Sequence, residues 1–221
     1  MQVLDDVWDD WWHEEEPFVL VFRTPKEPTE TEGDLDPPQP LDTKAVVRDL
    51  PLAAAGGPAV AFFGLDRGRS VVPVLQEALP PACPFYDVVI DEWALSREEL
   101  PAEAPRPGIQ ILRTEKNNLT LPADALVGLV LFVDAYHRLW EPLPLLQRLK
   151  EHMPPSGLVA VIDRKGPDAE PRRLAGHRRR ISPHLVIEEM RQAGFHLRQT
   201  LPAPAEDRFF LLFSLEGPSS Q

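Results

Sequence analysis

From residue 41 onward, short apolar runs alternate with segments in which apolar positions recur at helical spacing. Continuous apolar runs of this length are typical of strands that are buried on both faces of a sheet. The runs predict strands at 59–63, 85–90, 109–112, 126–133, 158–162, 195–199 and 209–215. Amphipathic spacing and capping residues predict helices at 43–50, 70–79, 143–152 and 182–193.

This alternation of strands and helices predicts the fold class. Right-handed βαβ crossovers place helices on both faces of a mainly parallel sheet. The last two predicted strands follow each other without a helix, so we expect them to pair antiparallel. We therefore predict an α/β domain with a Rossmann-like, mostly parallel seven-stranded sheet, a C-terminal antiparallel strand and helices on both faces. Ligands bind at the carboxyl ends of the strands in such sheets.

Residues 1–40 have a different composition from the rest of the chain, being acidic, rich in tryptophan and then rich in proline. The first 16 residues have apolar positions near helical spacing, and 18–22 is a short apolar run that predicts a strand. Residues 24–40 are too polar to form a core and are predicted to be a linker. We therefore divide the chain into an acidic N-terminal extension, 1–40, and an α/β domain, 41–217.

Charge and composition narrow the classes of function. The formal net charge of −12 argues against general nucleic-acid binding, although residues 164–180 are basic. The single cysteine, Cys83, excludes an internal disulfide and a cysteine-rich zinc site. No apolar run approaches the roughly 18 residues of a membrane helix. The N-terminus lacks the features of a secretory signal, so we expect a cytoplasmic location.

Several stretches of the chain, taken in order, resemble the class I S-adenosylmethionine-dependent methyltransferases. The segment DALVGLVLFVDAYHRLWEPLPLLQRLKEHMPPSGLVAVID is similar to that family's fourth strand, next helix and the turn before strand five. HRRRISPHLVIEEMRQAGFHLRQ is similar to the following helix and strand six, and DRFFLLF to the closing strand. The resemblance implies the Rossmann-like methyltransferase fold and S-adenosylmethionine as cofactor.

The loop after the first predicted strand departs from the family's acidic-x-Gly-x-Gly-x-Gly pattern. In FFGLDRGRS, Gly64 and Gly68 match the outer glycines, whereas Phe62 replaces the acid and Asp66 the middle glycine. A glycine permits positive φ and close approach of a ligand. A carboxylate at Asp66 either crowds and repels the methionine carboxylate or contacts its amino group. Gly128 also stands where the family commonly has an aspartate.

The other cofactor residues implied by the resemblance follow strands two and three. Asp91, or its neighbour Glu92, would accept hydrogen bonds from the ribose hydroxyls. Glu115 would lie near the adenine amino group. Together with Gly64 and the other loop residues, these positions make up the predicted cofactor site.

Asp134, Tyr136 and His137 follow the fourth predicted strand, where a substrate would lie. His137 is a candidate general base that removes a proton from a hydroxyl or amine before methyl transfer. Asp134 and Tyr136 are candidates for orienting the substrate or the methionine end of the cofactor. The alternative is a loop that only packs against the end of the strand.

Three other features have two or more interpretations. The histidines lack metal-ligand spacing, so we predict no metal site. The basic run 172–180 either binds an anionic substrate, pairs with the acidic N-terminal segment or is solvated. The tryptophans are candidates for a lid over the pocket, for docking on the domain or for binding a protein partner. They are Trp8, Trp11 and Trp12.

The leading interpretation is a methyltransferase that acts on a small molecule. The alternative is a catalytically inactive methyltransferase-fold protein that serves as a protein-binding or scaffold subunit, since Phe62, Asp66 and Gly128 weaken the cofactor pattern. An NAD-binding Rossmann domain fits less well because the glycine spacing differs from that motif.

Overall fold

The computed structural model describes residues 39–54, 59–64, 66–90, 109–114, 119 and 121–217. The strands are β1 Ala59–Gly64, β2 Phe85–Ile90, β3 Ile109–Thr114, β4 Val127–Val133, β5 Leu158–Arg164, β6 His196–Leu201 and β7 Arg208–Ser214. The α-helices are α3 Thr43–Asp49, α4 Val71–Ala78, α5 Pro142–Glu151, α6 Arg172–Arg178 and α7 Pro183–Gln192. The predicted strand at 18–22 and the tryptophan-rich segment lie outside the described residues.

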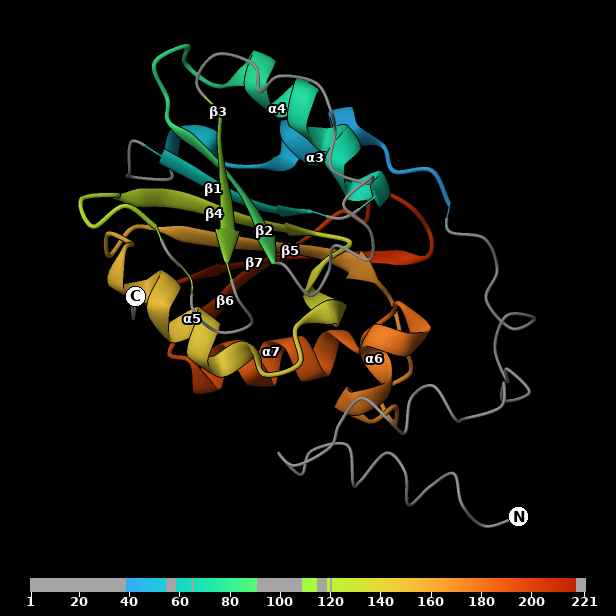
Figure 1. Cartoon of the computed structure of the whole chain (residues 1–221). Coiled ribbons are helices and arrows are strands. Elements are labelled where there is room, and N and C mark those ends of the chain that lie inside the picture. The colour runs from blue at the N-terminus through green and yellow to red at the C-terminus, as the bar shows by residue number, and fades with distance from the viewer. Residues whose placement is uncertain are drawn as a thin grey trace, which may run out of the picture. The chain divides into compact units, whose positions relative to one another are not determined.

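The strands form one sheet in the order β3-β2-β1-β4-β5-β7-β6. Strands β1 to β5 run parallel, and β7 runs antiparallel to both β5 and β6. Helices α3 and α4 lie on one face of the sheet, and α5, α6 and α7 lie on the other (Figure 1). The predicted α/β, Rossmann-like architecture is thereby confirmed, and the order reverses between β1 and β4. A crevice at such a reversal is where ligands bind in this class of sheet.

The central strands carry the core. Every residue of β1 and of β4 is buried, as expected for apolar strands with helices on both sides. On one face, α5 buries Leu145, Leu146 and Leu149 against the sheet at helical spacing. On the other face, α3 and α4 bury a second cluster that includes Val46 and Leu75. Two packed layers therefore hold the sheet rigid beneath its carboxyl edge.

The predicted helix boundaries rest on identifiable caps. The Ser182 hydroxyl accepts a hydrogen bond from the His184 amide at 3.2 Å, and α7 begins with Pro183. Gly194 follows this helix with a φ of 88°, a conformation that favours glycine. Pro73 lies in the first turn of α4, where a missing N–H costs nothing. The short helix α6 was not predicted, because its sequence is dominated by charged residues.

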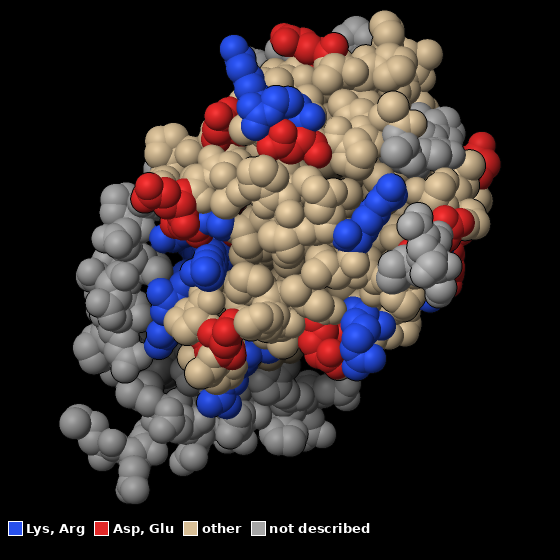
Figure 2. Space-filling model, turned by 180° about the vertical axis from the view of Figure 1, so that it is seen from behind, with Lys and Arg blue, Asp and Glu red and all other residues tan. Residues whose placement is uncertain are grey.

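The described surface does not concentrate one sign of charge on the face opposite to that of Figure 1. Acidic and basic side chains lie interspersed around a largely uncharged central area there (Figure 2). Within the described ranges, none of the helices combines the length and apolar content required to cross a bilayer.

Candidate active site

The carboxyl edge of β1 and β4 brings together several of the predicted site residues. Gly64 ends β1 and pairs in register with Val133, the last residue of β4. Gly68 lies in the 3-10 helix η2, Asp66–Ser70, which directly follows β1. Asp134 follows β4 and leads into the 3-10 helix η4, Tyr136–Arg138.

Some predicted cofactor residues fall outside what the structure describes. Asp91 and Glu115 follow β2 and β3 but lie outside the described residues, as does the side chain of Asp66. Strands β2 and β3 neighbour β1 in the sheet and run parallel to it. Their carboxyl ends therefore lie on the same edge as Gly64.

The loop after β1 is packed too closely to accept side chains at its glycines. A Cβ at Gly68 would overlap the Val133 carbonyl oxygen, and one at Gly64 would overlap the ring of Phe62. The Phe62 ring is fully buried and stacks on Phe85 with 6.0 Å between ring centroids. An apolar core contact therefore stands where the resembling family has an acid.

An ion pair ties this loop to the neighbouring strand. The guanidinium of Arg69 in η2 donates two hydrogen bonds to the Asp87 carboxylate in β2, one of them with an Nη1–Oδ1 distance of 3.2 Å. Burial raises the pKa of Asp87, and the positive charge of Arg69 opposes that rise. The pair fixes η2 on the sheet, and nothing in the sequence pattern pointed to it.

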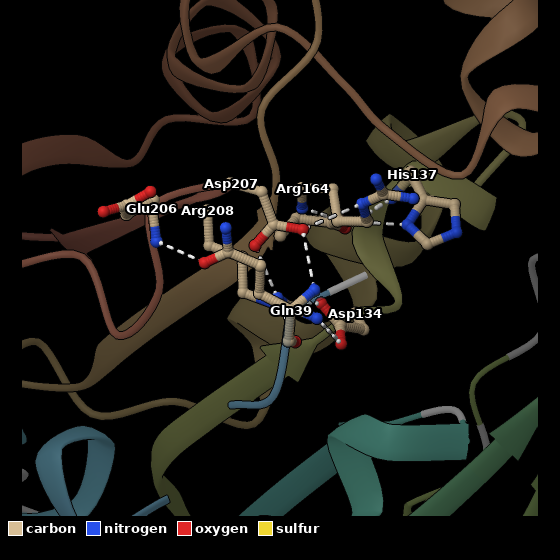
Figure 3. Close-up of polar contacts among 8 residues, drawn as sticks. Gln39, Asp134, His137, Arg164, Glu206, Asp207 and Arg208 are labelled. Atoms are coloured by element: carbon tan, nitrogen blue, oxygen red, sulfur yellow. Dashed lines mark hydrogen bonds and ion pairs between the residues drawn. The ribbon is translucent and has the colours of Figure 1, made fainter. Parts of the chain in front are cut away.

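Asp134 is engaged by a buried arginine (Figure 3). Arg208, the first residue of β7, donates from Nε and Nη2 to the two Asp134 carboxylate oxygens at 3.0 and 2.9 Å. Its Nη1 donates to the Gln39 carbonyl at 2.9 Å and to Asp207 at 2.7 Å. Asp134 has a φ of 49°, which is unusual for a residue with a side chain. Both carboxylate oxygens thus already hold a partner.

His137 and Asp163 form a buried dyad. The His137 amide donates to one Asp163 carboxylate oxygen at 2.9 Å, and the ring Nδ1 lies 2.8 Å from the other. Asp163 is fully buried in β5 and also accepts from the Arg164 amide at 2.7 Å. In the tautomer in which Nδ1 donates to this carboxylate, the neutral ring has its lone pair on Nε2. This arrangement has the form of a general base with its orienting acid.

Tyr136 is placed differently from the prediction that it orients a substrate. Its ring is fully buried in the core, edge-on to Phe132 with 5.5 Å between centroids. Burial raises the pKa of Tyr136 well above its ordinary value, and the Glu189 carboxylate raises it further. The alternative interpretation, a residue that packs the strand end, fits this side chain because its ring faces the core.

Arginines of the basic run pair with acids of the same domain. Arg172 lies 2.8 Å from Glu189 in α7. Arg178 and Arg180 both contact Glu170, each with a nitrogen–oxygen distance of 3.1 Å. These pairs neutralise part of the positive charge that the sequence places there.

The histidines do not assemble a metal site in the described part of the chain. His184 is an exposed residue that pairs with Asp168 at 2.9 Å. The side chain of His177 lies outside the description. Among the residues described, no three His, Cys, Asp or Glu side chains gather to hold a metal ion.

The sequence did not predict that Asp163 would pair with His137 or Arg208 with Asp134. It also did not predict that Arg172 would bind groups inside the domain. Asp163 is the next-to-last residue of the apolar strand LVAVIDR, and Arg208 begins another, RFFLLFS. A charged residue at the edge of a buried strand needs a partner, so this position was an available signal. The partners themselves are 26 and 74 residues away in sequence.

Comparison with known proteins identifies the fold. No family model and no curated protein sequence matches the chain. A methyltransferase from Aquifex aeolicus described as S-adenosylmethionine-dependent is 19% identical, with a TM-score of 0.56, over 80% of this chain and 91% of that one. Human N-acetylserotonin methyltransferase, in complex with S-adenosylmethionine, is 18% identical, with a TM-score of 0.53, over 80% of this chain and 52% of that one.

A third similar structure is the O-methyltransferase NcsB1 from neocarzinostatin biosynthesis, in complex with S-adenosylmethionine and 2-hydroxy-5-methyl naphthoic acid. It is 14% identical, with a TM-score of 0.52, over 76% of this chain and 51% of that one. The chain thus spans about half the length of the human protein and of NcsB1. These likenesses and the strand order agree with the resemblance noted from the sequence. The chain has the class I S-adenosylmethionine-dependent methyltransferase fold.

Proposed function

We propose that the protein is an S-adenosylmethionine-dependent methyltransferase that acts on a small molecule through His137. The observation that carries this proposal is the His137–Asp163 dyad at the carboxyl end of β4, with 2.8 Å between Nδ1 and the carboxylate. It lies on the edge where β1 ends in a glycine loop. Removal of a substrate proton needs a proton acceptor at the carboxyl edge of the sheet, where ligands bind in folds of this class.

The residues at the edge of β1 to β3 are compatible with an adenosyl cofactor. Gly64 and Gly68 let the loop after β1 approach the Phe62 ring and the Val133 carbonyl of β4 closely. In our proposal the backbone near Gly64 and Gly68 lies against the methionine part of S-adenosylmethionine, with Asp66 near its amino group. Asp91 binds the ribose hydroxyls and Glu115 lies near the adenine. When bound, the cofactor supplies an electrophilic methyl group.

The protein's own residues then orient and deprotonate the substrate. His137 Nε2 accepts the proton of a hydroxyl or amine, and Asp163 stabilises the resulting imidazolium through Nδ1. Holding the nucleophile in line with the methyl group supplies part of the rate, since positioning is worth several kcal/mol. Asp134 has a structural role in this proposal and does not bind the substrate, because Arg208 binds both of its carboxylate oxygens.

A small-molecule substrate is supported by two of the similar proteins. NcsB1 was solved with a naphthoic acid, and the human protein is described as an N-acetylserotonin methyltransferase. At identities of 18% or less, these proteins support a substrate class and no particular substrate. We propose that Trp8, Trp11 and Trp12 bind a protein partner.

The test is calorimetry and thermal unfolding with S-adenosylhomocysteine. Ligand at 100 times its dissociation constant adds about 2.7 kcal/mol of stability. We expect binding to the wild type, loss of it in Asp91→Ala, and normal binding in Glu77→Ala, an exposed acid on α4. Absence of binding to the wild type at millimolar ligand contradicts the proposal.

A transfer assay tests the role of the dyad. Labelled S-adenosylmethionine is incubated with a panel of small phenols and amines, and His137→Gln is compared with wild type. We expect the variant to retain cofactor binding and to lose about 100-fold or more in turnover, the range of general-base catalysis. Equal turnover in both proteins removes His137 as the base.

The inactive scaffold remains a second candidate, favoured by one observation. Phe62 stands where the family has an acid, and its ring is built into the core against Phe85. The calorimetry separates the two functions, because a scaffold without a cofactor site gives no heat and no stabilisation.

A further inference from the structure

Arg172 lies beneath the turn that carries His137. It is the first residue of α6, and its guanidinium points to three backbone carbonyls of the turn after β4. Nη1 donates to the His137 carbonyl at 3.3 Å, and Nη2 donates to the Tyr136 carbonyl at 3.2 Å. Nη2 also donates to the Leu139 carbonyl. One side chain thus binds the Tyr136 and His137 carbonyls of η4 and the carbonyl of Leu139, the residue after it.

These bonds bring a charged donor to the carbonyls of a short helix. The Tyr136 carbonyl also accepts a hydrogen bond from the Leu139 amide at 3.1 Å, so Arg172 is its second donor, and both contacts of Arg172 with η4 are partly buried. Hydrogen bonds from a charged donor are stronger than those between neutral groups. The planar fork of arginine reaches several acceptors at once, which a lysine ammonium on a flexible stem does not reproduce.

A second side chain orients the arginine. Glu189 of α7 lies 2.8 Å from Arg172 Nε. Burial raises the pKa of Glu189, while the Arg172 charge opposes that rise. The guanidinium carbon also lies 5.7 Å from the centre of the buried Tyr136 ring. Helices α6 and α7 are thereby joined to the turn η4 through one guanidinium.

The consequence concerns the orientation of the imidazole. His137 is held through its amide by Asp163 at 2.9 Å and through its carbonyl by Arg172 at 3.3 Å. With the His137 backbone held at both ends, only its side-chain torsions remain free. The 2.8 Å contact between Nδ1 and Asp163 therefore depends on the position of that backbone. Loss of the carbonyl bonds lets the turn rotate and weakens the contact that sets the tautomer.

We propose that Arg172 is a positioning residue for His137, acting through the backbone of η4 and supported by Glu189. Its effect on catalysis rests on the proposed function, in which His137 is the base. Its effect on the imidazole does not, since that is a property of the protein alone. This role is not the binding of an anionic substrate, because the Arg172 guanidinium already contacts backbone carbonyls and Glu189.

The experiment is a histidine-selective ¹⁵N NMR titration of the full chain, with His137 assigned from the spectrum of His137→Gln. In the wild type we expect the neutral ring of His137 to carry its proton on Nδ1. In Arg172→Met we expect a mixture of both tautomers. The matched control is Arg173→Met, which removes a neighbouring and more exposed arginine of α6 and leaves the His137 signals unchanged.

An unchanged His137 tautomer in Arg172→Met, with only a lower melting temperature, overturns the proposal. Should that variant fail to fold, Arg172→Lys decides the question in the same titration. It keeps the charge beside Glu189 but loses the fork, so the same change in tautomer is expected, and a wild-type signal overturns the proposal. Where turnover is measurable, we expect about a 10- to 100-fold loss of kcat in Arg172→Lys with cofactor affinity unchanged.

The two proposals fail independently. Absence of S-adenosylhomocysteine binding in the wild type contradicts the proposed function, but it leaves the NMR result for Arg172 standing. Normal cofactor binding together with an unaltered His137 signal in the Arg172 variants removes the positioning role alone.

Discussion

Replacing Arg208 with methionine tests whether the buried pair with Asp134 holds the carboxyl edge of the sheet together. The Arg208 side chain is 0% exposed and that of Asp134 is 13% exposed. Methionine of similar length removes the charge and leaves the carboxylate buried without its cation. Breaking such a pair by removing one partner costs about 3–5 kcal/mol. At roughly 2–4 °C per kcal/mol for a domain of this size, the melting temperature is expected to fall by about 6–20 °C.

The stability lost in Arg208→Met depends on pH, and the surroundings of Asp134 give the direction. Burial raises the pKa of Asp134, and the hydrogen bonds from Arg208 lower it, so Arg208→Met raises that pKa further. An acid whose pKa is higher in the folded than in the unfolded state binds protons on folding, so stability falls as pH rises between the two values. The defect relative to wild type is therefore largest at neutral pH and shrinks as pH falls through the raised pKa.

Urea unfolding followed by circular dichroism at pH 7.5 and pH 5 measures this effect. The double variant Asp134→Asn with Arg208→Met no longer buries a lone charge, and we expect it to be more stable than Arg208→Met alone. The control, Arg191→Met, removes one partner of a surface pair with Glu188, whose side chains are 66% and 47% exposed. Such pairs are worth about 0–1 kcal/mol. If Arg208→Met lowers the free energy of unfolding by no more than Arg191→Met does, the buried pair does not stabilise the edge of the sheet.

Three further substitutions follow from the packing. Gly68→Ala places a Cβ on the Val133 carbonyl, a backbone atom that cannot yield, so a loss of about 1–3 kcal/mol in urea unfolding is expected. Leu146→Ala leaves a cavity at a fully buried position in α5 and is expected to cost about 2–5 kcal/mol in the same assay. Arg69→Met leaves Asp87 buried and alone, and because burial already raises the pKa of Asp87, the loss of stability is expected to diminish below neutral pH.

The sequence predicted the elements of the sheet well because burial on both faces leaves a local trace. The apolar run at 126–133 matches β4, Val127–Val133, and the run at 158–162 lies within β5, Leu158–Arg164. The serine–proline start of α7 was equally readable, since a cap depends on residues adjacent in the chain. The charged helix α6 has no comparable pattern and was missed.

For the candidate site, the sequence predicts only which residues follow the strands, and its role as a cofactor or substrate site stays a prediction. Strand ends in a parallel sheet meet at one edge, so the sequence predicts Gly64, Gly68 and His137 at the same edge. The state of each side chain was not predictable. Tyr136 lies in the core, while Asp134 is held by a residue 74 positions later in the chain.

What the amino-acid order alone determined is the layered α/β architecture and the edge at which a ligand would bind, because both follow from local periodicity and from the handedness of crossovers. The pairing of charges was decided by the tertiary structure. Asp163, Arg208 and Arg172 find their partners only when strands and helices distant in sequence pack side by side. Buried polar groups must be paired, but the sequence does not state with which residue.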